Sequence, residues 1–236
     1  MNAMMGHLQR ELEKLKKRIL ALGAAVEGRV QASVRAVERL DAEKAKWVVD
    51  ADHEIDETEV EVEEECLKLL ALYQPVAVDL RFIACVIKIN NDLERIGDEA
   101  VNIARRVLDM VRDAGPGDQC SFDVRSLGEK SLAMLQQSLD ALVHLDTDLA
   151  YRVLATDDDV DSLYWQSARG LIEEMKAGPG RVEFLLSQVF VARHLERIGD
   201  HATNIAEEVI HLVQGEVIRH RAFRERRKPP PETPLV

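Results

Sequence analysis

A six-residue motif, LERIGD, occurs twice in the chain and constrains its fold more than any other feature. The first copy spans residues 93–98 and the second spans 195–200, and both continue with Ala, Asn, Ile and Ala at an offset of 102 residues. A second match, at an offset of 105, relates the pair Asp52 and Asp56 to the pair Asp157 and Asp161. Two matches at nearly the same offset predict a duplicated structural unit.

Apolar residues recur with a helical period between the few turn-forming residues. Leu12, Leu15 and Ile19, for example, follow the spacing of three and four that marks one face of a helix. Aromatic residues make up only 4% of the 236 residues, which is too few for a typical β-sandwich or barrel. We therefore expect six long helices, over approximately 5–40, 42–73, 77–113, 121–146, 148–177 and 181–214. Asp41 is the predicted N-cap of the second helix.

The predicted fold class is all-α, with two tandem three-helix bundles related by internal duplication. The stretch 114–117, Ala-Gly-Pro-Gly, is typical of a linker, so we expect a first bundle over residues 1–114 and a second over 119–215. The basic, Pro-rich tail 216–236 is expected to be a solvated, disordered end, the alternative being a docking arm for an anionic surface. One continuous six-helix bundle is the alternative architecture, because a short linker lets the halves pack together.

Charge and cysteine content exclude several classes of protein. With 31 Lys and Arg against 43 Asp and Glu, the net charge is −12, which repels phosphate backbones, so nucleic acid is not an expected partner. The three cysteines show no pairing pattern, which fits a reducing compartment. No apolar run approaches the roughly 18 residues of a membrane span, and the N-terminal residues lack a signal-peptide pattern. The expected location is the cytoplasm.

Pairs of carboxylates four residues apart recur in both repeats. The members of a pair stack on one helix face with a rise of about 6 Å and repel each other unless a cation neutralises them. A helical wheel places the LERIGD acids opposite the apolar stripe and the Asp pairs at its edge, so that two neighbouring helices would line an acidic groove on the surface of each bundle. The candidate metal ligands are Asp52, Asp56, Glu94, Asp98, Asp157, Asp161, Glu196 and Asp200, with Asn102 and Asn204 as secondary candidates.

Hard oxygen ligands of this kind suit divalent or trivalent ions such as iron, magnesium, manganese or calcium. Zinc is also a candidate ion, although the absence of a clustered Cys or His set argues against a structural zinc site. The alternative is a solvated acidic face with ordinary pairs to neighbouring arginines. We interpret Gly97 and Gly199 as sites of close helix packing, and His53, His194 and His201 as uninvolved neighbours of the acids.

A metal-dependent oxidase or metal-storage bundle is the alternative function. Ferritin-like oxidases need Glu-x-x-His on two helices, projecting into the core. That motif occurs once here, at Glu208 and His211, and no phosphate-binding loop, nucleophile elbow or dinucleotide fingerprint is present. We therefore expect no enzymatic activity, no catalytic residue and no organic cofactor.

Two stretches of the chain resemble the PhoU family of phosphate-signalling regulators. YQPVAVDLRFIA at 73–84 runs into NNDLERIGDEAVNIA at 90–104, and the second LERIGD copy extends the resemblance over about residues 5–214. The resemblance implies two tandem three-helix bundles that hold iron or other metal clusters on their surfaces with the carboxylates given above. The second half has GPGRVEFL in place of QPVAVDLR, which puts the equivalence of the two end loops in doubt.

The resemblance also implies a cytoplasmic, non-enzymatic role in phosphate homeostasis. Family members keep the phosphate-starvation genes off when phosphate is plentiful and restrain phosphate uptake, by linking the ATPase subunit of the phosphate ABC transporter to a sensor histidine kinase. Those two proteins are the expected partners, and a homodimer and peripheral association with the membrane are expected as well. The acidic body favours basic partner surfaces and disfavours direct capture of free phosphate, unless a bound cation reverses the local charge.

Overall fold

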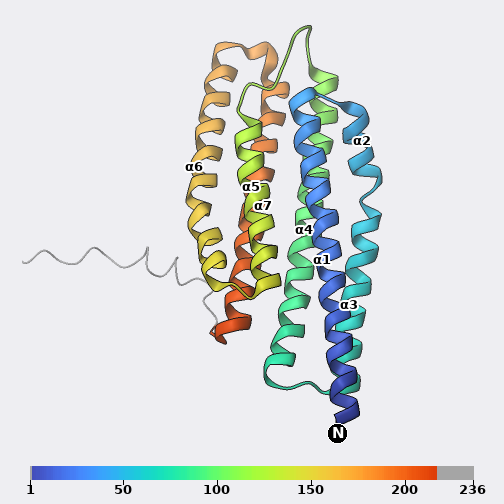
Figure 1. Cartoon of the computed structure of the whole chain (residues 1–236). Coiled ribbons are helices and arrows are strands. Elements are labelled where there is room, and N and C mark those ends of the chain that lie inside the picture. The colour runs from blue at the N-terminus through green and yellow to red at the C-terminus, as the bar shows by residue number, and fades with distance from the viewer. Residues whose placement is uncertain (1, 217–236) are drawn as a thin grey trace, which may run out of the picture.

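A computed structural model describes residues 2–216, except for the side chains of residues 2–5 and 179. Its helices are α1 (Asn2–Arg39), α2 (Ala42–Asp50), α3 (His53–Tyr73), α4 (Ala77–Asp113), α5 (Val124–His144), α6 (Thr147–Ala177) and α7 (Val182–Gln214), with a short 3-10 turn, η1 (Pro179–Arg181), before α7 (Figure 1). The described residues contain no strand, which confirms the all-α prediction. None of these helices combines the length and apolar composition needed to cross a membrane. The prediction for the tail, from residue 217 on, lies outside the described residues.

The helix expected over 42–73 is broken in two, which corrects the sequence-based prediction. Ala51 leaves the helical conformation with φ −96° and ψ 10°, so that α2 ends at Asp50 and α3 begins at His53. The carbonyl of Ala51 accepts a hydrogen bond from Nη2 of Arg29 in α1 at 3.1 Å. Because the partner that stabilises this break comes from a different helix, the local sequence carries no sign of it.

The second helical segment of each half begins with the same turn. Leu40 and Leu145 both adopt a left-handed conformation, with φ of 48° and 52°. Asp41 and Asp146 follow them, and each carboxylate accepts a hydrogen bond of 2.9 Å from the backbone N–H three residues further on. The N-cap predicted at Asp41 is therefore confirmed, and the turn repeats at an offset of 105 residues.

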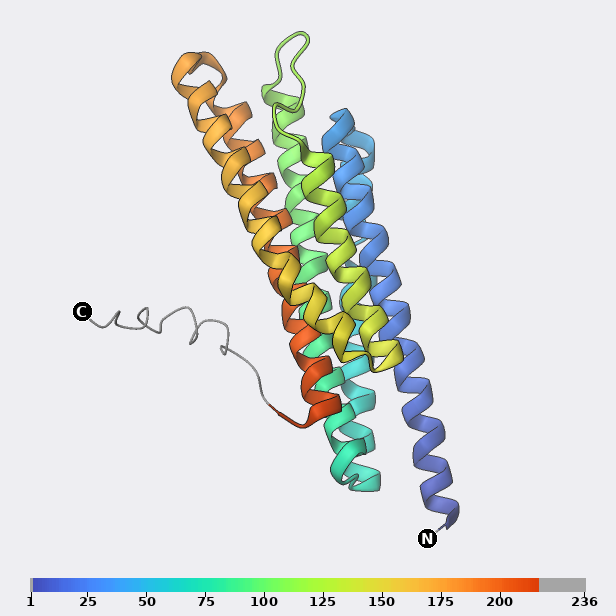
Figure 2. The same cartoon turned by 60° about the vertical axis from the view of Figure 1, so that its left-hand side comes forward.

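The two halves pack side by side in opposite directions. Helix α4 lies along α7, and α1 lies along α5, with the chain running upward in the first member of each pair and downward in the second (Figures 1 and 2). The contacts are reciprocal at equivalent positions: a Cβ on Gly23 would lie 2.7 Å from Cδ1 of Leu139, and a Cβ on Gly128 would lie 2.8 Å from Cγ2 of Val34. The repeats are thus related by a pseudo-twofold axis across the helices.

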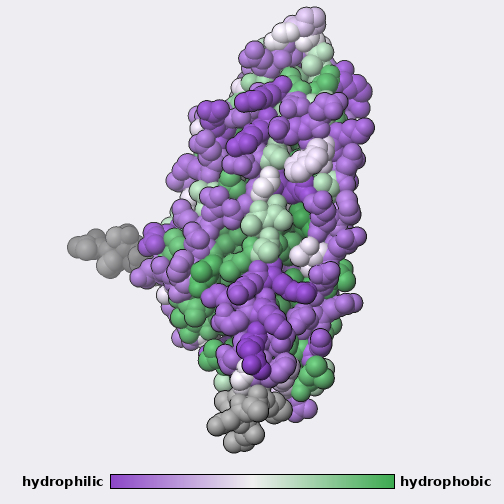
Figure 3. Space-filling model, turned by 45° about the vertical axis from the view of Figure 1, so that its right-hand side comes forward, coloured by the Kyte–Doolittle hydropathy of each residue, from purple (hydrophilic) through white to green (hydrophobic). Residues whose placement is uncertain are grey.

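The buried apolar side chains form one continuous cluster that passes through both halves. Helices α4 and α7 lie at the centre of the molecule, where each contacts its own bundle and the other half. The outer surface is largely hydrophilic, although apolar residues gather in the lower part of the face drawn in Figure 3. The central position of α4 and α7 matters because these two helices carry the LERIGD motifs.

Candidate metal centres

Four of the candidate ligands meet where α3 packs on α4. The carboxylates of Asp52, Asp56, Glu94 and Asp98 make up this first cluster. Desolvation raises the pKa of Asp52, and the charges of Asp56 and Asp98 raise it further. The pKa of Asp98 is raised by desolvation and then by Asp56, and that of Glu94 by desolvation and then by Asp98. Acids from two helices therefore share one electrostatic environment.

The second repeat places its candidate ligands in the same way, between α6 and α7. This second cluster consists of Asp157, Asp161, Glu196 and Asp200. Burial raises the pKa of Glu196 to about 7, and the charges of Asp200, Asp161 and Asp157 contribute to the rise. The pKa of Asp200 is raised by burial and then by Asp161. The duplicated sequence thus produces two equivalent clusters, one in each half.

A glycine in each LERIGD motif lets the two acid-bearing helices approach each other. A Cβ on Gly97 would lie 3.2 Å from Cδ1 of Ile55, and a Cβ on Gly199 would lie 3.4 Å from Cγ1 of Val160. Ile55 and Val160 are equivalent at the offset of 105 residues. The interpretation as a site of close packing is confirmed at Gly97, whereas the contact at Gly199 has an ordinary length.

The solvent exposure of the acids differs from the expectation at one residue. Asp98 and Asp200 are exposed, as the helical wheel places them, but Glu196 is only 7% exposed. The wheel treats a helix as packed on one side, whereas α7 contacts α4, α5 and α6. The Arg193 guanidinium, which pairs with Oε1 of Glu196, also lies over the ring of Tyr164.

The second oxygen of Glu196 is the feature that best fits a cation. Oε2 of Glu196 is buried and has no hydrogen-bond partner among the described residues. A buried carboxylate oxygen without a partner is costly, and a metal ion shared with the neighbouring carboxylates would satisfy it. The chemistry of the donors therefore fits a hard cation. The side chains are not arranged as a formed coordination shell, because no set of three or more His, Cys, Asp or Glu residues within 2–216 converges closely enough.

The two asparagines proposed as secondary ligands make other contacts. Nδ2 of Asn204 donates to Oδ1 of Asp92 at 3.0 Å, so this side chain is directed to the contact between α4 and α7. Oδ1 of Asn102 accepts a hydrogen bond from Arg105 at 3.4 Å. In this structure the amide nitrogen of Asn204 is therefore engaged with α4, and the role of both asparagines as secondary ligands stays a prediction.

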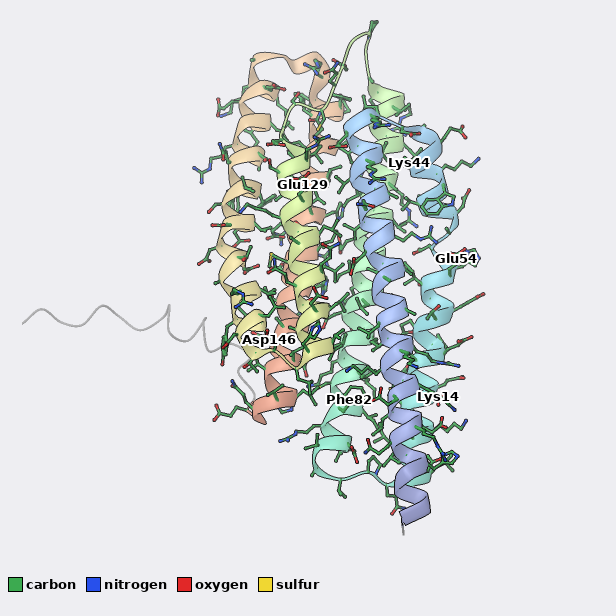
Figure 4. All side chains as sticks on the ribbon, viewed as in Figure 1. Lys14, Lys44, Glu54, Phe82, Glu129 and Asp146 are labelled. Atoms are coloured by element: carbon green, nitrogen blue, oxygen red, sulfur yellow. The ribbon has the colours of Figure 1, made fainter. Side chains whose placement is uncertain are left out.

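Sequence reasoning missed the role of Arg29, which lies beside the first cluster. Its side chain is buried with the residue only 5% exposed, and it pairs with Glu54, which Figure 4 labels on α3. The guanidinium carbon also lies 4.3 Å from the centre of the Trp47 ring, and its charge acts to lower the pKa of Asp52. The sequence carried one signal of this buried position, because Arg29 is a charged residue in phase with the apolar stripe of α1.

Two histidines interpreted as uninvolved are engaged by acids of the other half. Nδ1 of His194 lies 2.6 Å from Oε2 of Glu99, and Nδ1 of His201 lies 2.9 Å from Oδ1 of Asp92. Arg197 also pairs with Glu99, at 2.8 Å. Glu99 and Asp92 lie on α4, about a hundred residues away in the chain, and are not candidate metal ligands, so the structure gives both histidines a role in the contact between the halves.

The single Glu-x-x-His motif lies in the same contact between the halves. The carboxylate of Glu208 pairs with Nζ of Lys88 at 3.0 Å. Glu208 therefore forms an ion pair between α7 and α4. This contact gives no structural support to the oxidase alternative, in which the motif would bind metal.

These features define a class of protein: an all-α chain of two tandem three-helix bundles, with one cluster of four carboxylates between α3 and α4 and an equivalent cluster between α6 and α7. A family model described as the PhoU domain matches residues 19–107 and 124–209. The chain belongs to the PhoU family.

Several relatives are similar to this chain over most of their length. A protein of Pseudomonas putida named "Phosphate-specific transport system accessory protein PhoU homolog" is 40% identical over 89% of this chain and 82% of its own. The Escherichia coli protein named "Phosphate-specific transport system accessory protein PhoU" is 33% identical over 91% of this chain and 88% of its own. The crystal structure of PhoU from Pseudomonas aeruginosa superimposes with a TM-score of 0.84 at 39% identity, covering 88% of this chain and 99% of that one.

Proposed function

We propose that this chain is a regulatory adaptor of phosphate homeostasis, which restrains both the phosphate-starvation response and phosphate uptake. The observation that carries the proposal is the PhoU match over both repeats, together with relatives named as accessory proteins of the phosphate-specific transport system. The adaptor acts in the cytoplasm, as a homodimer, through contacts with the ATPase subunit of the phosphate ABC transporter and with a sensor histidine kinase. It has no catalytic activity of its own.

Exposed apolar surface supports a role in protein contacts. Val76, in the turn between α3 and α4, is 74% exposed, and Leu72, Val78 and Leu80 beside it are exposed as well. A groove of about 340 Å³ lies near this end of the molecule, between α1, α4, α5 and α7, and Phe82 is one of its lining residues (Figure 4). Exposed apolar residues gathered at one end of a molecule are typical of protein interaction sites.

The two carboxylate clusters are proposed metal sites. The residues that would hold the ions are Asp52, Asp56, Glu94 and Asp98 in the first half, and Asp157, Asp161, Glu196 and Asp200 in the second. A bound iron, manganese, magnesium, calcium or zinc ion would supply the positive charge that the clusters lack. Neutralising the clusters would stabilise each bundle, because their acids repel one another.

Deleting the gene tests the regulatory role directly. In cells grown with abundant phosphate, a reporter driven by a phosphate-starvation promoter should switch on in the deletion strain and switch off again when the wild-type gene is restored. Restoring a variant with Val76→Asp and Val78→Asp, which adds charge to the apolar end, should fail to silence the reporter. A reporter that stays silent in the deletion strain would contradict the proposal.

Metal analysis tests the proposed sites and the enzyme alternative together. Protein purified without chelator should contain metal, and millimolar Mn²⁺ added to chelator-treated protein should raise its melting temperature, since a ligand that binds the native state stabilises it. Oxygen consumption that Glu196→Gln abolishes would favour the oxidase instead. An equal melting temperature with and without every candidate metal would contradict the metal sites.

A further inference from the structure

The two clusters have equivalent acids but face different residues on the first helix of their bundles. At the offset of 105 residues, Arg29 of α1 corresponds to Met134 of α5. The structure supports this equivalence, because Oγ of Ser33 and Oγ of Ser138 each donate to the carbonyl three residues earlier at 2.8 Å. A buried cation in the first half is therefore replaced by an uncharged thioether in the second.

Arg29 is held in place beside the first cluster. It donates to the carbonyl of Ala51 at 3.1 Å, pairs with Glu54 and stacks on Trp47, and it is almost wholly buried. Moving the guanidinium away would break all three contacts and leave the carbonyl of Ala51, at the break between α2 and α3, without this donor. Its positive charge, which acts on Asp52, is therefore a permanent part of this cluster.

The cations near the second cluster are held less firmly. Arg193 pairs with Glu196 and Arg197 acts on Asp200, but their side chains are 46% and 42% exposed. Arg197 also pairs with Glu99 and Arg193 lies over Tyr164, but both side chains are partly in solvent, so they can move away from the carboxylates at a lower cost than a wholly buried arginine. Met134 packs against the second LERIGD motif, with Sδ 3.6 Å from where a Cβ on Gly199 would be, and it brings no charge.

A second exchange acts in the same direction. Arg105 of α4 acts to lower the pKa of both Asp52 and Asp98. Its equivalent in α7, at the offset of 102 residues, is Glu207. The first cluster therefore has two arginines whose equivalents in the second half, Met134 and Glu207, carry no positive charge.

We propose that Arg29 is the built-in counter-ion of the first cluster, so that the second cluster is the high-affinity metal site and the first binds metal ions weakly. The inference rests on the proposed metal-binding role of the clusters. A fixed positive charge repels an incoming metal ion and leaves less negative charge for it to neutralise. The buried Oε2 atom of Glu196, by contrast, has no partner among the described residues, so a metal ion would remove the cost of its burial.

Titration with Mn²⁺ tests this difference in the full chain. After chelator treatment, free Mn²⁺ is measured by its electron paramagnetic resonance signal, and the wild type should show two classes of site at least tenfold apart in Kd. Glu196→Gln should remove the tight class, and Asp98→Asn should leave the tight class unchanged. Two classes of equal affinity, or loss of the tight class in Asp98→Asn, would overturn the proposal.

Substitution of Arg29 is the second test of this proposal. Arg29→Met, which copies the residue of the second half, should tighten the weak class at least tenfold, and Arg29→Lys, which keeps the charge, should not. Circular dichroism confirms that each variant is folded, and if Arg29→Met does not fold, the Glu196 and Asp98 variants still decide. A wild type that binds no Mn²⁺ or other candidate metal would overturn the proposed metal sites as well, whereas two equal classes would overturn this inference alone.

Discussion

His201 of α7 and Asp92 of α4 face each other across the centre of the molecule, with Nδ1 of the histidine 2.9 Å from Oδ1 of the aspartate. The pseudo-twofold axis relates them to a second pair, His194 and Glu99, because Asp92 is equivalent to His194 and Glu99 to His201 at the offset of 102 residues. Both acids lie on α4 and both histidines on α7. Two copies of α4 would bring acid against acid, so this arrangement favours pairing of the two unlike halves.

Exchanging the members of the Asp92 and His201 pair should preserve stability better than changing either one. Asp92→His or His201→Asp alone leaves two like groups in a buried contact, which should lower the free energy of unfolding by about 1–3 kcal/mol. The double exchange restores a complementary pair and should recover most of that loss. Urea unfolding of the four proteins gives the coupling energy, and strictly additive losses would contradict the pairing.

Alanine at the two motif glycines should have unequal effects. Alanine is favoured over glycine within a helix by about 1 kcal/mol. At Gly199 the new Cβ would lie in ordinary contact, 3.4 Å from Val160, whereas at Gly97 it would press on Ile55 at 3.2 and 3.3 Å. Gly199→Ala should therefore be the more stable variant in thermal unfolding.

Gly170, which has open space around its Cα, is the matched control for this pair. Gly170→Ala should raise the free energy of unfolding by about 0.5–1 kcal/mol. Combining Gly97→Ala with Ile55→Val should relieve the contact at Gly97. If Gly97→Ala stabilises the chain as much as Gly170→Ala does, the close approach of α3 and α4 is not what requires a glycine.

The two aspartate caps should contribute equally to stability. Asp41 and Asp146 accept hydrogen bonds of the same length in equivalent turns. Replacing either with alanine should lower the free energy of unfolding by about 1 kcal/mol, because a backbone N–H at the start of a helix loses its partner. Asn variants, which keep a side-chain acceptor, should lose little, and a large difference between the two alanine variants in urea unfolding would argue against equivalent halves.

Glu196 should make the metal-free protein less stable as the pH rises. Burial and the nearby carboxylates raise its pKa from 4.5 to about 7 in the folded chain, so between these values the folded state holds a proton that the unfolded state releases. This rise in pKa corresponds to a loss of about 3 kcal/mol in the free energy of unfolding. The loss is absent below pH 4.5 and complete above pH 7.

Comparison with a neutral side chain isolates this effect. Glu196→Gln should be more stable than the wild type at pH 8 in the presence of chelator, and the advantage should shrink as the pH falls to 5. The Asp79→Asn variant, altered on α4 far from the clusters, serves as a control that should follow the wild type. A Glu196→Gln variant with the same pH profile as the wild type would show that the carboxylate is not desolvated.

Much of the architecture is encoded locally. The helices at 77–113 and 181–214 were expected from apolar spacing, and the structure has them at Ala77–Asp113 and Val182–Gln214. The duplication also predicted which acids would be neighbours, because equivalent residues on equivalent helices take equivalent places. Whether those neighbours hold metal ions stays a prediction.

The sequence by itself determined the helices, their duplication and the two sets of acids, because helical periodicity and capping act over a few residues. Tertiary structure alone decided the break at Ala51, the burial of Glu196 and the pairing of His194 and His201 with acids of α4. Each of these depends on a neighbour from a distant segment: Arg29 for the break, the central position of α7 for Glu196, and the acids of α4 for the histidines. The histidine pairs form only when the two halves pack against each other, whereas the break at Ala51 needs only the packing of α1 within the first half.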